Sequence, residues 1–138
     1  FHVHADSETN FSLFKPEPAA LRTSQPPATD SLAVRLSPNT DVCTAIEDIC
    51  RQHGIANATI QGGVGSTVGA VFEDGRTVEP FVTELLVRSG RVREDPHGAP
   101  RAEIDVTLVD FTGTMAEGRL RRGANPVLVT FELVLVPV

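Results

Sequence analysis

The hydrophobic residues in most of this chain recur with a period of two rather than 3.6. A period of two is typical of β-strands, whose side chains point alternately to the two faces of a sheet. Strand-like segments lie at residues 32–36, 55–61, 67–72, 76–78, 83–89, 91–93, 101–109, 115–120 and 126–136, separated by turns. A chain of this kind must bury one face of a sheet, so a sheet dominates its fold.

The last predicted strand, Pro126–Val136, is apolar on both faces. Its first face carries Val127, Val129, Phe131, Leu133 and Leu135, and its second carries Leu128, Val134 and Val136. This pattern predicts a central strand of the sheet, or a strand that lies under another subunit.

One helix is predicted between the first two strands. Val42, Ile46 and Ile49 recur at helical spacing up to His53, and Gly54 stands where a helix commonly ends. One helix and about seven or eight strands, without strand–helix–strand repeats, predict an α+β domain. Its sheet is expected to be mixed and mostly antiparallel.

The compact domain is predicted to span residues 31–138. Residues 15–30 hold four of the ten prolines, among Ser, Thr and Ala, and are predicted to form a linker or surface arm. Residues 1–14 begin with strand-like alternation, and we expect them to be the strand and tail of a preceding domain or an N-terminal arm.

The charge of the chain restricts its partners. Twelve basic residues, eleven of them arginines, stand against 18 acidic residues, for a net charge of −6 and a sequence pI near 5.1. Domains that hold nucleic acid by bulk electrostatics usually have a basic face and a high pI, so the charge disfavours DNA as a partner. No stretch approaches the about 20 consecutive apolar residues of a transmembrane helix.

The two cysteines are predicted to be buried and reduced. Cys43 and Cys50 lie on the predicted helix, about 10.5 Å apart along its axis. A disulfide requires Cα atoms within about 7 Å, so the two cannot pair with each other. Reduced thiols indicate a cytoplasmic protein.

The segment Gln61–Gly69 (QGGVGSTVG) is rich in glycine. It lacks the lysine of a phosphate-binding loop and leads into a strand, which argues against a nucleotide site. We expect a tight bend between two strands, where glycines adopt positive φ and let another backbone approach. Ser66 and the neighbouring amides remain candidates for the lining of a pocket.

The predicted strand at 101–109 has one apolar and one charged face. The core face carries Ala102, Ile104, Val106 and Leu108, and the other face carries Arg101, Glu103, Asp105 and Thr107. Two carboxylates and a guanidinium in a row are typical of a solvated sheet face. They also suit a row of ion pairs at a subunit interface or one wall of a polar pocket.

The remaining arginines gather in two groups that have acidic neighbours. The groups are Arg88, Arg91 and Arg93, and Arg119, Arg121 and Arg122. Ion pairs within and between subunits are expected here rather than a nucleic-acid patch.

No catalytic residue is predicted, because no spacing in the chain pairs a nucleophile with a base. His2 and His4 share one face of a predicted strand and would need a third ligand to chelate a metal. His97 is predicted to lie in a turn. We therefore assign no metal ligand and no cofactor.

Several short motifs follow one another in a recognisable order: Leu36-x-Pro38, His53-Gly54-Ile55, Gln61–Ser66, Asp74-Gly75, Leu85–Gly90 and Glu117–Leu120. From about Ser31 to Val138 this ordered set resembles the plants-and-prokaryotes-conserved (PPC) domain. That domain accompanies AT-hooks in plant nuclear proteins and occurs alone in bacterial proteins named for DNA binding. The resemblance implies an α+β sheet domain that assembles as a homotrimer, with pockets enclosed between adjacent subunits.

Bacterial members of this family typically carry histidines suited to metal binding on one strand, and a further histidine later in the chain. By resemblance, these positions are Arg101, Glu103 and Asp105 on the strand and Arg119 later in this sequence. A guanidinium is no metal ligand, so a network between Arg119 and the carboxylates is expected instead. Asp6–Phe14 is similar to the junction between tandem copies of the domain, which implies that residues 31–138 are a second copy.

The leading hypothesis is a non-enzymatic homotrimeric PPC module for assembly or recognition, with DNA binding disfavoured by the charge. The alternative is a protein, enzymatic or not, that binds a small anionic or polar ligand near Glu103, Asp105 and Arg119, with Ser66 nearby. Metal binding through His2, His4 or His97 ranks lowest.

Overall fold

The computed structural model describes residues 2–5, 12–15 and 31–138. Strands β1 (His2–Ala5) and β2 (Ser12–Lys15) pair antiparallel near the N-terminus. The predicted linker at residues 15–30 and the predicted tandem junction fall largely outside the described residues, so both stay predictions.

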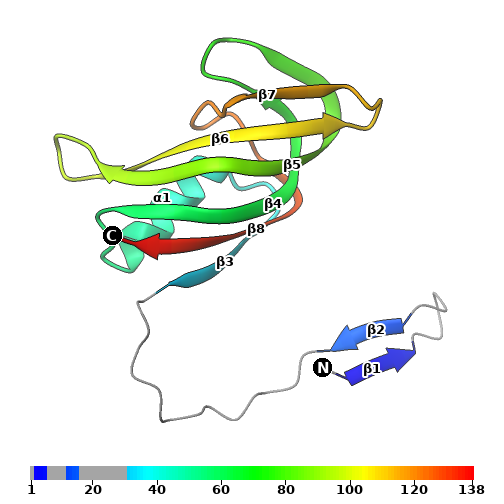
Figure 1. The fold of residues 1–138 in the computed structure, drawn as a ribbon, viewed down its shortest axis with the longest axis horizontal. Helices are drawn as coiled ribbons and strands as arrows, with labels where there is room; N and C mark the ends of the chain where they lie inside the picture. Colours follow the sequence, from blue (N-terminus) through cyan, green and yellow to red (C-terminus); the bar gives the residue numbers. More distant parts are fainter. Residues whose placement is uncertain (1, 6–11, 16–30) are drawn as a thin grey trace.

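The domain is built on a six-stranded sheet in which all neighbouring strands are antiparallel. The strand order across the sheet is β3-β8-β4-β5-β6-β7 (Figure 1). The strands are β3 (Leu32–Leu36), β4 (Ala58–Val71), β5 (Thr77–Glu94), β6 (Pro100–Asp110), β7 (Met115–Arg119) and β8 (Val127–Pro137). The predicted α+β class with a mostly antiparallel sheet is confirmed.

The sheet has fewer strands than predicted because short segments merge into two long strands, β4 and β5. The predicted bend at Gln61–Gly69 is wrong, since β4 runs through all of these residues. Instead, the pairing of β4 with β8 shifts register between Gln61 and Gly63 and again between Gly65 and Thr67. Such bulges bend and twist a strand without ending it.

Glycine is required in β4 because the strand passes close to its neighbours. A Cβ atom on Gly65 would lie 2.7 Å from the Cα atom of Phe131, and one on Gly63 would lie 2.6 Å from Cγ2 of Val87. Gly62 has a φ of +66°, which side chains disfavour. The predicted close approach and positive φ are therefore confirmed, although the bend is not.

Helix α1 (Val42–Gln52) has the predicted ends. The amide of Thr44 donates to Oδ1 of Asp41 at 2.9 Å, which caps the N-terminus. His53 is the C-terminal cap residue, and Gly54 follows it with a φ of +65°. The helix packs against β6 and covers one face of the sheet (Figure 1).

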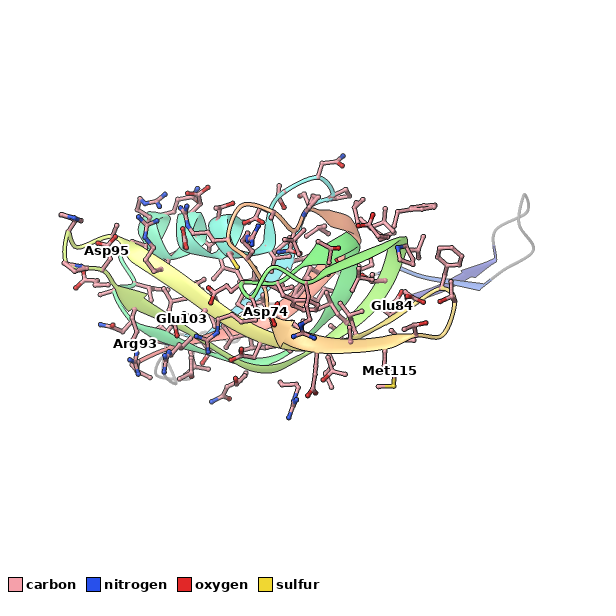
Figure 2. All side chains as sticks on the ribbon, turned by 90° about the horizontal axis from the view of Figure 1, so that it is seen from above. Asp74, Glu84, Arg93, Asp95, Glu103 and Met115 are labelled. Carbon is pink, nitrogen blue, oxygen red and sulfur yellow. The ribbon has the colours of Figure 1, made fainter. Side chains whose placement is uncertain are left out.

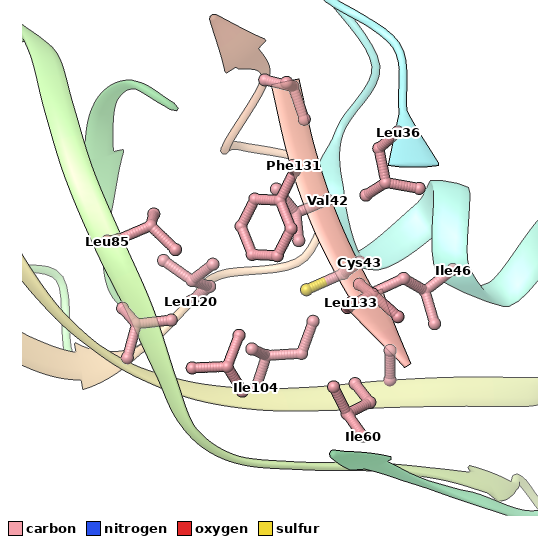
Figure 3. Close-up of a cluster of buried hydrophobic side chains, with 14 of the residues drawn as sticks. Leu36, Val42, Cys43, Ile46, Ile60, Leu85, Ile104, Leu120, Phe131 and Leu133 are labelled. Carbon is pink, nitrogen blue, oxygen red and sulfur yellow. The ribbon is translucent and has the colours of Figure 1, made fainter. Parts of the chain in front are cut away.

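The hydrophobic core lies between α1 and the sheet (Figure 3). The predicted core face of β6 is buried along its whole length: Ala102, Ile104, Val106 and Leu108. Cys43 and Cys50 are buried free thiols, as predicted. Burial, with a smaller effect of nearby carboxylates, raises the pKa of Cys43 to about 12. Its thiol is thus protonated and unreactive at neutral pH.

Strand β8 lies between β3 and β4, which confirms the prediction of a central strand. Of the first of its two apolar faces, Val127, Phe131, Leu133 and Leu135 are buried, whereas Val129 is 62% exposed. Gly65 pairs with Phe131 and Thr67 pairs with Val127, so residues 128–130 of β8 stand opposite one residue of β4. The bulge turns Val129 outward.

The hairpin between β4 and β5 folds over the outer edge of β7. Phe72 forms a β-bridge with Leu120, and Nη2 of Arg76 donates to the carbonyl of Glu117 at 2.8 Å. These contacts cover an edge that would otherwise leave backbone groups unpaired.

Candidate functional site

The face of the sheet turned away from α1 is open, and Figure 2 shows Arg93 and Met115 on this side. Directly paired residues of antiparallel strands share a face. One cross-strand row on this face spans all six strands: Arg35, Glu132, Val64, Leu86, Thr107 and Glu117. We call this surface the open face.

Apolar side chains occupy the middle of the open face. Val64 and Leu86 pair directly with each other on the two central strands and are 53% and 52% exposed. Val134 of β8 is 37% exposed. A sheet face that contacts water usually carries polar side chains at such positions. Neighbouring exposed apolar side chains instead mark an interaction surface.

Charged side chains of β5, β6 and β7 form ion pairs beside these apolar residues. Arg119 donates from Nε and Nη2 to the two carboxylate oxygens of Asp105, at 3.1 and 3.0 Å. Its Nη1 lies 3.4 Å from Oε2 of Glu103, and Nε of Arg91 donates to the same oxygen at 2.7 Å. We call these four residues the ion-pair cluster. Bidentate pairing of this kind needs the planar fork of arginine.

The pairing of Arg119 with Asp105 favours the charged forms of both groups. The hydrogen bonds from Arg119 lower the pKa of Asp105, and the Ser89 hydroxyl, which donates to Asp105 at 3.1 Å, adds to the effect. In turn, Asp105 raises the pKa of Arg119. Both groups are therefore ionised at neutral pH.

Two hollows flank Asp105. The smaller, of about 150 Å³, includes Arg91, Glu103 and Arg119 in its lining. The larger, of about 590 Å³, includes Arg76 and Arg88. All three guanidinium nitrogens of Arg119 already contact carboxylates. The hollows thus present paired charges, which a ligand would have to separate before binding them.

Of the predicted site residues, the structure brings Glu103, Asp105 and Arg119 together. Arg101 and Ser66 lie elsewhere. Arg101 contacts Asp95 at 3.1 Å and Glu47 at 3.5 Å. Ser66 is 5% exposed, and its hydroxyl accepts a hydrogen bond from the amide of Val129 at 3.1 Å.

Glu47 was missed by the sequence analysis, although it anchors a second charged cluster. It is fully buried on α1, where Nε and Nη2 of Arg122 hold its carboxylate at 2.8 to 3.0 Å. The amide of Ala102 donates to it at 3.1 Å. Glu47 lies four residues after Cys43 and three before Cys50, on the apolar stripe of the helix, and this spacing is the sequence signal that could have indicated its burial.

We predict that Arg119→Met lowers the free energy of unfolding by about 1 kcal/mol or less at neutral pH, because this pair is partly exposed. The pKa of Asp105 is lowered on folding, so its contribution is present above the unfolded pKa and is lost as the pH falls through the folded pKa. The difference in unfolding free energy between the wild type and Arg119→Met should be constant from about pH 5 to 7 and shrink below about pH 4. Urea unfolding at several pH values measures it. A difference that grows in acid would contradict this pairing.

Metal and membrane contacts find no structural support in the described residues. Residues 2–5, 12–15 and 31–138 contain no group of three or more His, Cys, Asp or Glu side chains arranged to hold a metal ion. Metal binding through His2, His4 or His97 stays the lowest-ranked hypothesis. In the same residues no helix has the length and apolar character that a membrane span requires.

The model of the Plants and Prokaryotes Conserved (PCC) domain family, abbreviated PPC above, matches residues 23–138. The chain belongs to this family. The resemblance inferred from the ordered motifs is thereby confirmed, and the match begins eight residues before the predicted domain start at Ser31. A comparison with curated proteins gives no match.

Solved structures share the fold of this PPC chain. A hypothetical protein of Salmonella enterica is 21% identical, with a TM-score of 0.62 and 80% of each chain covered. A plant- and prokaryote-conserved protein of Pyrococcus horikoshii is 20% identical, with a TM-score of 0.59 and 78% of each chain covered. A "Putative DNA-binding protein" of Ralstonia eutropha is 18% identical, with a TM-score of 0.61, and the match covers 77% of this chain and 76% of that one.

Proposed function

We propose that this chain is a non-enzymatic PPC module that assembles into a homotrimer and acts in assembly or recognition. The observation that carries the proposal is the apolar centre of the open face, where Val64 and Leu86 are about half exposed on the two central strands. A second copy of the chain that covers this centre would remove the apolar side chains from water. Burial of one leucine side chain is worth about 1.5–3 kcal/mol.

The charges on the open face are compatible with such a cover. Arg91 pairs with Glu103, Arg119 with Asp105, and Arg88 with Glu117. Charges that are already paired are much less costly to desolvate than isolated ones. For the same reason, the charged face of β6 suits the row of ion pairs at a subunit interface that the sequence suggested.

DNA binding is the function that the names of related proteins suggest, but the arginines of this chain argue against it. Seven of the arginines in residues 31–138 contact carboxylates: Arg51, Arg76, Arg88, Arg91, Arg101, Arg119 and Arg122. Paired guanidinium groups offer little net attraction to phosphates, and the net charge of the chain is −6.

A mobility-shift titration with generic duplex at low salt tests this point. Low salt strengthens every phosphate contact, so it is the most permissive condition. We expect no shift at about 10 µM protein, within the range where non-specific DNA binders act. A shift that disappears as salt is raised would instead assign DNA binding to the module.

Binding of a small anionic or polar ligand at Glu103, Asp105 and Arg119 is the weaker alternative. It needs free charges in a pocket, whereas these side chains satisfy one another. Phosphate and acetate should therefore leave the thermal unfolding temperature unchanged apart from their general salt effect. Stabilisation that saturates, and that is absent in Arg119→Met, would favour the ligand hypothesis.

The variant Leu86→Asp tests the assembly itself. A charge at the apolar centre should weaken each contact by about 2 kcal/mol, or roughly 30-fold in the association constant. The mass in solution, measured by light scattering, should fall while the far-UV circular dichroism stays unchanged. Asp48→Ala, on the exposed side of α1, is the control and should keep the mass of the wild-type protein. Equal masses of wild type and Leu86→Asp would contradict the proposal.

A further inference from the structure

The sheet contains a hollow of about 470 Å³ where β3, β8 and β4 meet, toward the β3 edge. Small residues make room for it. Ala33 of β3 lies in one cross-strand row with Val134 of β8 and Gln61 of β4, and Gly62 follows without a side chain. A Cβ atom on Gly62 would meet nothing within 4 Å. The lining is mostly apolar, and the volume lies in the range of small-molecule sites, about 300–1,000 Å³.

The bulge in β4 places a backbone segment outside the ladder at this hollow. Gln61 pairs with Val134 and Gly63 pairs with Leu133, so Gly62 is the extra residue. Gly62 has no partner in the register of β4 with β5 either. The extra residue of a bulge is left unpaired, and bulges are common next to active sites. The backbone of Gly62 is therefore a candidate partner for a polar group in the hollow.

Two opposite charges line the hollow without forming an ion pair. Arg35 and Glu132 stand directly opposite each other on β3 and β8. Nε of Arg35 donates to the Thr130 hydroxyl at 3.1 Å, and that hydroxyl donates to Oε1 of Glu132 at 3.5 Å. Within residues 31–138 no ion pair includes either charge. Unlike the ion-pair cluster, the hollow thus offers a cation and an anion that a ligand need not separate.

We propose that this hollow binds a small zwitterion with an apolar side chain, of the class of the aliphatic and aromatic α-amino acids. The ligand carboxylate accepts hydrogen bonds from the guanidinium of Arg35, and the ligand ammonium donates to the carboxylate of Glu132. The apolar side chain lies over Ala33 and Val134, which removes apolar surface from water. One chain holds all of these residues, so the binding goes beyond the proposed self-assembly and does not require it.

Isothermal titration calorimetry with L-leucine and L-phenylalanine tests the site. At least one of them should bind saturably, with one site per chain. Three analogues of leucine test the three parts of the site: N-acetyl-L-leucine lacks the ammonium, L-leucinamide lacks the carboxylate, and glycine lacks the apolar side chain. Each should bind about tenfold or more weakly than L-leucine. No saturable binding of either amino acid would overturn the site, and equal binding of N-acetyl-L-leucine would overturn its choice of a zwitterion.

Variants locate the binding. Arg35→Gln and Glu132→Gln each remove one charge, and Ala33→Leu fills the hollow, so each should weaken the binding of the amino acid about tenfold or more. Arg35→Gln should leave the weak binding of L-leucinamide unchanged, because that analogue has no carboxylate. Glu79→Gln removes an exposed carboxylate of β5 outside the hollow and is the control. Far-UV circular dichroism checks that each variant is folded. Wild-type affinity in Arg35→Gln and Glu132→Gln, or an equal loss in Glu79→Gln, would overturn the assignment.

Discussion

Arg122→Met is expected to lower the free energy of unfolding by about 3 kcal/mol. Arg122 holds the carboxylate of Glu47, which is fully buried. Without Arg122, the Glu47 carboxylate keeps only two of its contacts. These are the more distant Arg101, at 3.5 Å, and the amide of Ala102. A buried carboxylate that loses its main partner costs several times more than an exposed pair.

The matched control is Arg51→Met. Arg51 also pairs with a carboxylate of α1, Asp48, but both side chains are more than half exposed. Arg51→Met should lower the free energy of unfolding by less than about 0.5 kcal/mol. Urea unfolding followed by far-UV circular dichroism at one protein concentration measures both, since the chain has no Trp or Tyr. Glu47→Gln added to Arg122→Met should recover part of the loss. Equal effects of the two arginine variants would contradict the account of Glu47.

Gly65→Ala is expected to lower the free energy of unfolding by about 3 kcal/mol or more. The added Cβ atom would lie 2.7 Å from both the Cα atom of Phe131 and the carbonyl oxygen of Thr130. Both are backbone atoms of the central strand β8, so they cannot move aside as a flexible side chain would. A loss of this size removes a large part of the about 5–15 kcal/mol that stabilises a typical domain.

Gly62→Ala is the control on the same strand. Its new Cβ atom would meet nothing within 4 Å, and its cost comes only from the φ of +66°. That cost is about 1–2 kcal/mol. The measurement is again urea unfolding of both variants. If Gly65→Ala were as stable as Gly62→Ala, the close approach of β4 to β8 would not be a constraint on the fold.

Local patterns in the sequence were sufficient to predict much of the fold. The helical spacing of Val42, Ile46 and Ile49 predicts α1 and Gly54 marks its end, and the alternation on β6 separates its core face from its charged face. The length of β4 was not predictable in this way. The local pattern of glycines in Gln61–Gly69 predicts a bend. Only the close approach of Phe131 and Val87 explains why these glycines continue a strand.

The candidate site was predictable only in part, for a related reason. Glu103 and Asp105 share a strand face, so their proximity follows from the period of two. The partnership of Arg119 with Asp105 came from the family resemblance, and the register of β7 on β6 confirms it. Arg101 instead contacts Glu47, a residue 54 positions earlier, through packing of α1 that no local pattern contains.

The mass in solution of the chain of residues 1–138 tests the central claim most directly. Sedimentation velocity over a range of concentrations should give a species of three times the chain mass of 14.8 kDa. The open face, with Val64 and Leu86 exposed, is the surface that this association would cover. A single species of 14.8 kDa at every concentration would contradict the claim.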